Sequence, residues 1–463
     1  MCLRKNPLTE MSYNFLKIEK IENFKRIQLW NRESSKDLFD FNSEILKSVL
    51  EIVDEVKKNG DKALLRYCKK FDGAVLKNAD DIRVKAEEIE DAGKTVHKKY
   101  PELVRAINVS YRNIKRYHAA QLKKEPESWF IGDYSEGKRL GQINRAIERV
   151  GLYIPGGRYI YPSSVLMAAI PAIAAGVGEI AVCTPPNREN QISEILLYIF
   201  SILGIGEVYK IGGAQAVAAL ALGTESVRKV DKIVGPGNVY VTSAKRLLYG
   251  IVGIDSLAGP SEILIIADSN AEPAYIAADI ISQSEHDPDA KSMLLSTSKL
   301  LAQKAVDEIY RQLDFFTGTS REVKSRNIIM ESLRKNCKIF YNSDINFLID
   351  ICNLVAPEHL EIMVSNYNRV FSKVKNAGAI FLGSSTPVAV GDYICGTNHV
   401  IPTGGSARFS SPLGVYDFLK KSSVAFYNLD ALKKEAKFIK TIADFENLTA
   451  HKRSVEIRIK EKK

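Results

Sequence analysis

The sequence predicts an α/β protein built from two parallel β-sheets that helices cover on both faces. From about residue 148 onward, short apolar runs rich in β-branched residues recur, and most of them end in glycine or proline. Segments long enough to form helices separate several of these runs, as expected when parallel strands are buried on both sides. The 463 residues, 45% of them hydrophobic, suffice for about three domains of roughly 150 residues each.

The predicted strands fall into two series, at about residues 148–240 and 258–385. In chain order they are RVGLYIPGG, EIAVCTPP, EVYKIGGA, KIVGPGN, EILIIAD and AGAIFLG. Residues 40–125 place apolar residues three and four apart with charges between them, which predicts helices. We expect these helices to pack around the second series.

This pattern divides the chain into two α/β domains and two small terminal segments. The first domain comprises residues 46–150 and 258–405, and residues 151–257 form the second. Residues 1–45 and 406–463 remain as terminal segments.

One uncharged stretch is long enough to cross a membrane. Residues 159–178 carry no charged side chain, but they include Pro162 and Pro171 and are rich in alanine, serine and glycine. A helix buried against a sheet fits this composition better, so we predict no membrane contact.

The formal charge of +10 raises the possibility of nucleic-acid binding. The net charge is +7 over residues 1–150, −4 over residues 151–300 and +7 over the remainder. Because acidic residues interrupt every basic run, the excess resembles a solvated surface rather than a basic stripe. We therefore predict no nucleic-acid partner.

The six cysteines are scattered, without a CxxC pair, in a chain too large to need disulfide bonds. The N-terminal residues MCLRKNPLTEMSYNF lack the apolar core of a secretory signal. These observations predict a reduced, cytoplasmic protein.

Glycine-rich turns that follow strands are the candidate cofactor sites. Gly176-Val-Gly178 and Gly204-Ile-Gly206 precede their strands, so they are unsuited to hold a phosphate at a helix start, and the chain has no standard GxGxxG. The turns after the strands each carry one polar side chain, Tyr153, Gln215 or Asn238, beside glycines. Three such turns in one domain predict a cofactor cleft in a Rossmann-like fold.

Nitrogen and oxygen donors gather in two segments that suit a metal ion. Gln283 and His286 lie three residues apart at the end of a predicted helix, on one face. The alternative is a histidine that caps the helix C-terminus. Asp392 and His399 lie on a glycine-spaced segment that we expect to be irregular. A zinc site with such ligands and an open position would be catalytic.

Glu358 and His359 form a third cluster. Pro357 suits the first turn of a helix, and from a helix start both side chains could reach into a cleft as two general bases with separate tasks. A capping glutamate with an incidental histidine is the alternative.

Together these clusters resemble the histidinol dehydrogenase family. The segments that carry the resemblance are IERVGLYIPGGRYIYPSSVLM, KIGGAQAVAALALGTESVRKVDKIVGPGNVYV, GIDSLAGPSEILIIAD, ISQSEHDPDAKS, NLVAPEHLEIM, GDYICGTNHVIPTGGSAR and ENLTAHKRSV. The resemblance implies a homodimer that oxidises L-histidinol to L-histidine through the aldehyde, with one zinc ion per subunit and two NAD⁺. It also implies that the terminal segments contribute to dimerisation.

The resemblance also assigns residues, position by position. The implied zinc ligands are Gln283, His286, Asp392 and, from a partner subunit, His451. His359 is implied as the base of the first oxidation and Glu358 as the residue that activates water in the second, while Tyr153, Gln215 and Asn238 match NAD positions. The implied substrate contacts are Ser261, Gln283, His286, His359, Asp392, His399, Glu446 and His451.

Two other functional classes remain open on the residues alone. A zinc hydrolase would use Glu358 to activate water without any nicotinamide cofactor. A nucleic-acid-binding protein would show a steep salt dependence of its affinity.

Overall fold

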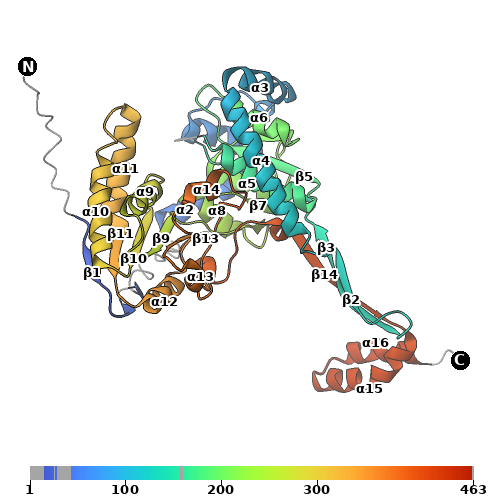
Figure 1. The fold of residues 1–463 in the computed structure, drawn as a ribbon. Helices are drawn as coiled ribbons and strands as arrows, with labels where there is room; N and C mark the ends of the chain where they lie inside the picture. Colours follow the sequence, from blue (N-terminus) through green and yellow to red (C-terminus); the bar gives the residue numbers. More distant parts are fainter. Residues whose placement is uncertain (1–14, 26, 29–42, 157–159, 461–463) are drawn as a thin grey trace, which may run out of the picture.

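The computed structural model describes residues 15–25, 27–28, 43–156 and 160–460. It contains two parallel sheets with helices on both faces and a three-stranded antiparallel ribbon that ends in a pair of helices (Figure 1). The predicted α/β fold class is therefore confirmed. Within the described residues, no helix is long and apolar enough to span a membrane.

The six-stranded sheet has the order β1-β11-β10-β9-β12-β13, and all its pairs are parallel. Its strands are β1 (Ile18–Lys20), β9 (Glu262–Ala267), β10 (Lys291–Ser296), β11 (Cys337–Tyr341), β12 (His359–Met363) and β13 (Ala379–Leu382). One face is covered by α9 (Pro273–Ser284), α10 (Lys299–Leu313), α11 (Ser320–Asn336) and α14 (Val388–Tyr393). The other face is covered by α12 (Ile345–Val355) and α13 (Tyr367–Phe371).

The five-stranded sheet has the order β6-β5-β4-β7-β8 and is also parallel. Its strands are β4 (Arg149–Tyr153), β5 (Glu179–Thr184), β6 (Glu207–Lys210), β7 (Lys232–Val234) and β8 (Gly253–Ile254). α2 (Glu44–Tyr67), α7 (Gly213–Leu222) and α8 (Val239–Leu248) cover one face. α3 (Ala86–Lys99), α4 (Pro101–Leu122), α5 (Pro162–Ala175) and α6 (Glu194–Ile202) cover the other.

The predicted packing of the helices of residues 40–125 was wrong. They cover the five-stranded sheet instead of the strands of residues 258–385. The physical reason is the composition of α5 and α7, which are buried nearly all round and need a second layer of helices outside them. Periodicity shows which face of a helix is apolar, but it does not show which sheet that face meets.

The uncharged stretch forms a buried helix over its described residues, as predicted, because α5 is enclosed in the core of the five-stranded sheet. Gly176 ends α5 in a left-handed conformation with φ of 86°, and Gly204 adopts φ of 69° in the turn after α6. Both glycines therefore lie in helix-to-strand turns, as predicted.

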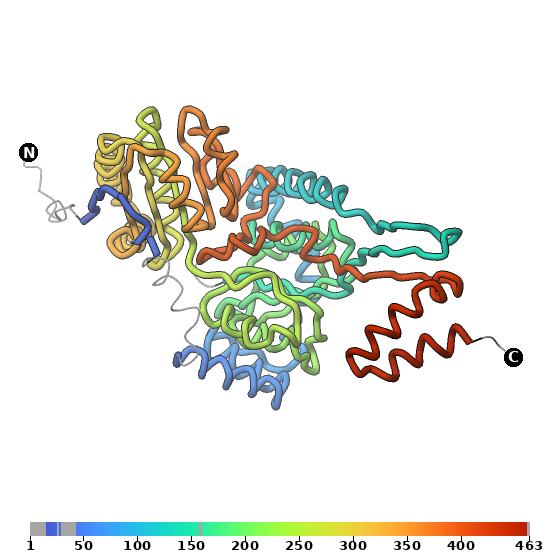
Figure 2. The backbone as a smooth tube through the Cα atoms, turned by 90° about the horizontal axis from the view of Figure 1, so that it is seen from below, coloured from blue at the N-terminus to red at the C-terminus, as the bar shows by residue number. Residues whose placement is uncertain are grey.

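The C-terminal segment is joined to residues near the start of the five-stranded sheet. β14 (Leu419–Tyr427) pairs antiparallel with β3 (Lys138–Ala146), which also pairs with β2 (Ser128–Ile131). α15 (Leu429–Phe445) and α16 (Thr449–Ile459) follow. In Figures 1 and 2 this helical pair lies at the far end of the extended ribbon, away from both sheets.

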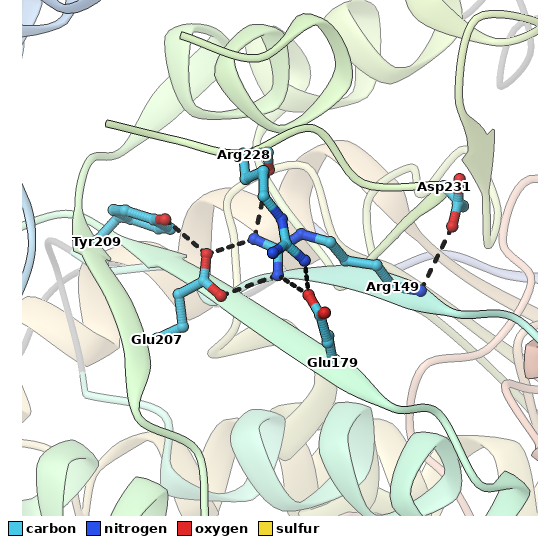
Figure 3. Close-up of polar contacts among 6 residues, drawn as sticks. All are labelled: Arg149, Glu179, Glu207, Tyr209, Arg228 and Asp231. Atoms are coloured by element: carbon cyan, nitrogen blue, oxygen red, sulfur yellow. Dashed lines mark hydrogen bonds and ion pairs between the residues drawn. The ribbon is translucent and has the colours of Figure 1, made fainter. Parts of the chain in front are cut away.

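An arginine joins the amino ends of three strands of the five-stranded sheet (Figure 3). The Arg149 side chain is 6% exposed, and its Nη1 donates to Glu179 Oε2 at 2.6 Å and to Glu207 Oε2 at 2.9 Å. Tyr209 Oη donates to Glu207 Oε1 at 2.6 Å. Burial opposes ionisation of Glu207, but Arg149 and Tyr209 outweigh it and lower the pKa of this carboxyl.

Arg149→Met should lower the free energy of unfolding by about 2 kcal/mol, because it leaves Glu207 without its cation and removes one of the two guanidinium groups that contact Glu179. This value lies below that of a fully buried pair, since Glu179 and Glu207 are 42% and 22% exposed. The urea midpoint of unfolding measures the effect. Arg228→Met is the matched control: this guanidinium also contacts Glu179 but is 65% exposed, so its loss should cost less than about 1 kcal/mol. Equal losses in the two variants would contradict this account.

Candidate active site

The two candidate bases lie at the amino end of β12, and the predicted helix start at Pro357 was wrong. α12 ends at Val355, Ala356 takes a left-handed conformation with φ of 52°, and β12 begins at His359. His359 pairs with Ile263 of β9 on one side and with Ala379 of β13 on the other. This pairing requires an extended strand where the proline had suggested a helix.

Both bases are hydrogen-bonded to the main chain of Glu262, the first residue of β9. Glu358 Oε2 accepts from the Glu262 N–H at 2.7 Å, and His359 Nδ1 lies 3.0 Å from the Glu262 carbonyl oxygen. Because a carbonyl can only accept, Nδ1 carries the proton and donates it. His359 Nε2 is buried and has no protein partner, so it is the ring nitrogen available to take a proton.

The electrostatic surroundings favour the charged form of His359. Burial alone would lower its pKa. The neighbouring Glu358 carboxylate and, to a smaller extent, Asp392 outweigh burial and raise the pKa to about 9. Glu262, whose side chain is also buried, has its pKa raised by burial and forms an ion pair with Lys291 at 3.5 Å. Sequence reasoning missed Glu262, because a main-chain partner leaves no motif.

Gln283 and His286 lie at the end of α9, as predicted. Gln283 is 2% exposed and its Nε2 has no partner, whereas His286 is exposed. Asp392 lies on α14, a short helix, so the predicted irregular segment begins only after Tyr393. Burial is the main cause of the raised pKa of Tyr393, and the negative charges of Asp392 and Glu285 add to it. The contribution from Glu285 indicates that the end of α9 lies near the end of α14.

These side chains suit a zinc ion in donor type, although one chain does not complete a site. An amide, an imidazole and a carboxylate are nitrogen and oxygen donors of the kind that zinc accepts, and the buried Gln283 amide lacks a partner in the protein. Within the described ranges, no three histidine, cysteine, aspartate or glutamate side chains converge into a metal-binding group.

The structure does not bring Glu446 and His451 to these ligands within one chain. Glu446 is the capping residue directly after α15, His451 lies in the first turn of α16, and both are exposed. Figures 1 and 2 place this helical pair far along the ribbon from α9 and α14.

His399 and Ser261 complete the predicted substrate contacts. His399 is hydrogen-bonded to the main chain of Asp392, and burial lowers its pKa. The loop that carries it is anchored by Asn398, whose Nδ2 donates to the Met167 carbonyl at 2.7 Å and lies 3.4 Å from Nε2 of the buried His118. Ser261 immediately precedes β9. Sequence reasoning left His118 without a role.

The three glycine turns meet at the carboxyl edge of the five-stranded sheet. In chain order its strands are arranged third, second, first, fourth and fifth, which places a ligand-binding switch point between β4 and β7. The Gly213 N–H donates to Tyr153 Oη at 3.1 Å, and a Cβ on Gly235 would lie 2.1 Å from the Tyr153 carbonyl oxygen. Gln215 is 1% exposed and its Nε2 has no partner.

Asn238 has a structural role besides its predicted one. Its Oδ1 caps α8 by accepting from the N–H groups of Tyr240 and Val241 at 3.1 and 3.2 Å. Its amide group is left for any ligand.

A short connection brings this edge towards the two bases. Residues 255–261 lead from the end of β8 to the start of β9, a span of at most about 25 Å. Thr242 Oγ1 of α8 donates to the Ala258 carbonyl at 3.1 Å, and the Gly259 N–H donates to Thr403 Oγ1 at 2.6 Å. The carboxyl edge of one sheet thus leads directly to the amino edge of the other.

Comparison with known proteins gives a consistent result. The family model described as histidinol dehydrogenase matches residues 37–459. The chain is 46% identical to the histidinol dehydrogenase of Clostridium acetobutylicum over 90% of this chain and 93% of that protein. It is also 46% identical to that of Caldanaerobacter subterraneus subsp. tengcongensis, over 93% and 96% of the two chains. The crystal structure of histidinol dehydrogenase from Elizabethkingia anophelis is similar with a TM-score of 0.84 at 34% identity, covering 96% and 98%.

In the metal-free protein the His359 imidazole should titrate near pH 9, and Glu358→Gln should move the titration to lower pH by removing the negative charge that holds the proton. Histidine NMR shifts measured against pH report this, and the signal lost in His359→Asn identifies the residue. His118, whose pKa burial lowers, is the internal control and should not move. An unchanged His359 titration in Glu358→Gln would show that Glu358 does not control this proton.

Proposed function

Because the chain belongs to the histidinol dehydrogenase family, we propose that it oxidises L-histidinol to L-histidine through L-histidinal, with two NAD⁺ and a zinc ion, as the last step of histidine biosynthesis. Family membership makes the protein an oxidoreductase. The observation that carries the proposed chemistry is the pair of buried bases on Glu262, with Glu358 Oε2 at 2.7 Å from its N–H and His359 Nδ1 at 3.0 Å from its carbonyl.

The two oxidations have separate bases. In the first, His359 Nε2 takes the hydroxyl proton of histidinol while the hydrogen on the same carbon leaves as hydride to NAD⁺. In the second, Glu358 takes a proton from water as the water attacks the aldehyde carbon, and a second hydride leaves to another NAD⁺. Four electrons therefore pass to two NAD⁺. Glu358 Oε2 accepts a hydrogen bond from the Glu262 N–H, so Oε1 is the oxygen that would take the proton from water.

Gln283, His286 and Asp392 of one subunit and His451 of its partner would hold the zinc ion. The ion would bind the imidazole and amino nitrogens of histidinol and orient the substrate, a template role. Ser261, His399 and Glu446 would contact the substrate beside these ligands and His359. Tyr153, Gln215 and Asn238 would bind NAD⁺ at the carboxyl edge of the five-stranded sheet.

An exposed apolar face supports the homodimer and the partner's contribution to each site. On α15, Phe438, Ile442 and Phe445 are 66%, 60% and 91% exposed and are spaced four and three residues apart, so they share one face. Such a face on a projecting arm is suited to pack against a second copy of the chain. That packing would carry Glu446 and His451 towards the other subunit.

The N-terminal segment, residues 1–45, was also predicted to contribute to dimerisation. Its strand β1 pairs with β11 of the same chain. Residues 1–14 and 29–42 lie outside the described residues, and a contribution of this segment to dimerisation stays a prediction. A cytoplasmic location also remains a proposal, which the free thiols of Cys68, Cys183 and Cys352 in the core support.

The zinc-loaded protein should form two NADH for each L-histidinol consumed, measured by absorbance and product analysis. Removal of the metal with a chelator should abolish the activity, and zinc should restore it. His359→Asn should lose the first oxidation and still bind zinc, since His359 is not one of the proposed ligands. Zinc-loaded protein that makes no NADH from histidinol would refute the proposal, and hydrolysis without NAD⁺ would favour the zinc hydrolase.

Mixed dimers test the shared site. His451→Ala and His359→Asn homodimers should both be inactive, but a verified mixed dimer should regain about half of the wild-type activity, because one of its two sites is intact. Mixing His359→Asn with Asp392→Asn is the control and should restore nothing, because both changes lie in the body of the subunit. Absence of recovery in the first pair would place His451 outside the partner's site.

A further inference from the structure

Two buried carboxyl groups lie behind the candidate site and have no part in the proposed chemistry. Glu361 follows His359 by two residues on β12, so both side chains lie on the same face of the six-stranded sheet. Glu361 is 1% exposed, and its neighbours across the strands are Ile265 and Phe381, both apolar. A carboxylate alone in this place would be strongly unfavourable.

The partner of Glu361 is a second acid, Asp279 of α9. Glu361 Oε2 is buried and accepts no hydrogen bond from a donor group in the described part of the chain, and the carboxyl group that interacts with it is that of Asp279. Neither acid forms an ion pair among the described residues. Two carboxylates in contact do not both ionise readily, so one proton bridges them. Burial raises the pKa of Asp279 to about 6, and burial together with the Asp279 carboxylate raises the pKa of Glu361 well above its usual value, so the pair keeps a proton to higher pH than isolated carboxyl groups do.

Glu361 also binds a third element. Its Oε1 accepts a hydrogen bond from the N–H of Val388, the first residue of α14, at 3.0 Å. Glu361 thus joins its own strand to α9 through Asp279 and to α14 through Val388.

The spacing along each element links this contact to the functional residues. Asp279 precedes Gln283 by four residues on α9, and Val388 precedes Asp392 by four residues on α14, one helical turn in each case. Phe381 packs beneath the same helix, since a Cβ on Gly391 would lie 2.6 Å from its ring. The carboxyl pair therefore lies one layer behind His359, Gln283 and Asp392.

We propose that Glu361 and Asp279 are positioning residues that share one proton and thereby hold α9 and α14 against β12, fixing the relative placement of Gln283, Asp392 and His359. The proposal rests on the proposed function for the roles of those three residues. The carboxyl pair itself touches neither the metal nor the substrate. The other titratable residues that these elements carry are His359 on β12, Tyr275 on α9, and Asp392 and Tyr393 on α14.

Two substitutions at Glu361 distinguish the effect of its hydrogen bonds from the effect of its volume in the core. In Glu361→Gln the amide can donate to Asp279 and accept from Val388, as the protonated acid does. Zinc affinity at pH 7, measured by competition with a chromophoric chelator, should stay within about threefold of wild type, whereas Glu361→Leu should weaken it at least about tenfold. A folded Glu361→Leu that binds zinc as wild type does would overturn the proposal.

Ile265→Ala is the matched control, because it opens a cavity beside Glu361 on the same face. It should lower the thermal midpoint of unfolding while leaving zinc affinity unchanged. An equal loss of zinc affinity in Ile265→Ala and Glu361→Leu would reduce Glu361 to a packing role and overturn the proposal.

A metal-free measurement keeps the proposal testable even if Glu361→Leu does not fold or the wild type binds no zinc. The raised pKa of Glu361 means that the folded chain binds more protons than the unfolded chain, so its contribution is present below pH 4.5 and is lost as pH rises. The thermal midpoint of wild type should therefore fall with rising pH relative to that of Glu361→Gln. Parallel curves would refute the shared proton. Absence of zinc binding or of histidinol oxidation in wild type would instead refute the proposed function.

Discussion

The pairing of β9 with β12 is the interaction on which the rest of the site depends. In this register the main chain of Glu262 meets both proposed bases, accepting from His359 and donating to Glu358. The carbonyl fixes which nitrogen of His359 carries its proton, and the N–H fixes which oxygen of Glu358 is free. Because both contacts come from the main chain, they persist through any side-chain change at Glu262 that keeps the strand pairing intact.

Apart from the edge strand β1, the two sheets share a strand order, but the candidate residues lie at opposite edges. The glycine turns lie at the carboxyl edge of the five-stranded sheet, as expected for open α/β sheets. The bases lie at the amino edge of the six-stranded sheet, where that rule predicts nothing. The short connection through residues 255–261 leads from one edge to the other, so the NAD⁺ proposed at one edge and the bases proposed at the other could serve the same substrate.

The sequence predicted the fold class and six strands, because apolar β-branched runs ending in glycine or proline are a strong local signal. It missed five strands of the parallel sheets, β1, β8, β10, β11 and β12, and the three strands of the antiparallel ribbon, because their short or polar runs do not end in glycine or proline. The helix expected at Pro357 and the irregular segment expected at Asp392 failed because tertiary pairing outweighed local preference. Glu262, His118 and the carboxyl pair were not found, since a contact between distant elements leaves no motif in one chain segment.

The charges of the buried residues near His359 influence one another. The negative charges of Glu358 and Asp392 both raise the pKa of His359 and favour its protonated form. A general base has to be unprotonated before it can accept a proton from the substrate. Any cation bound at Asp392 would offset one of these two influences and lower the pKa of His359 towards neutrality. The proposed shared proton would keep Glu361 and Asp279 from adding two negative charges to the same face. In the proposed arrangement the carboxyl pair joins α9 and α14 to β12 while burying one negative charge. An ion pair in the same place would bury two charges.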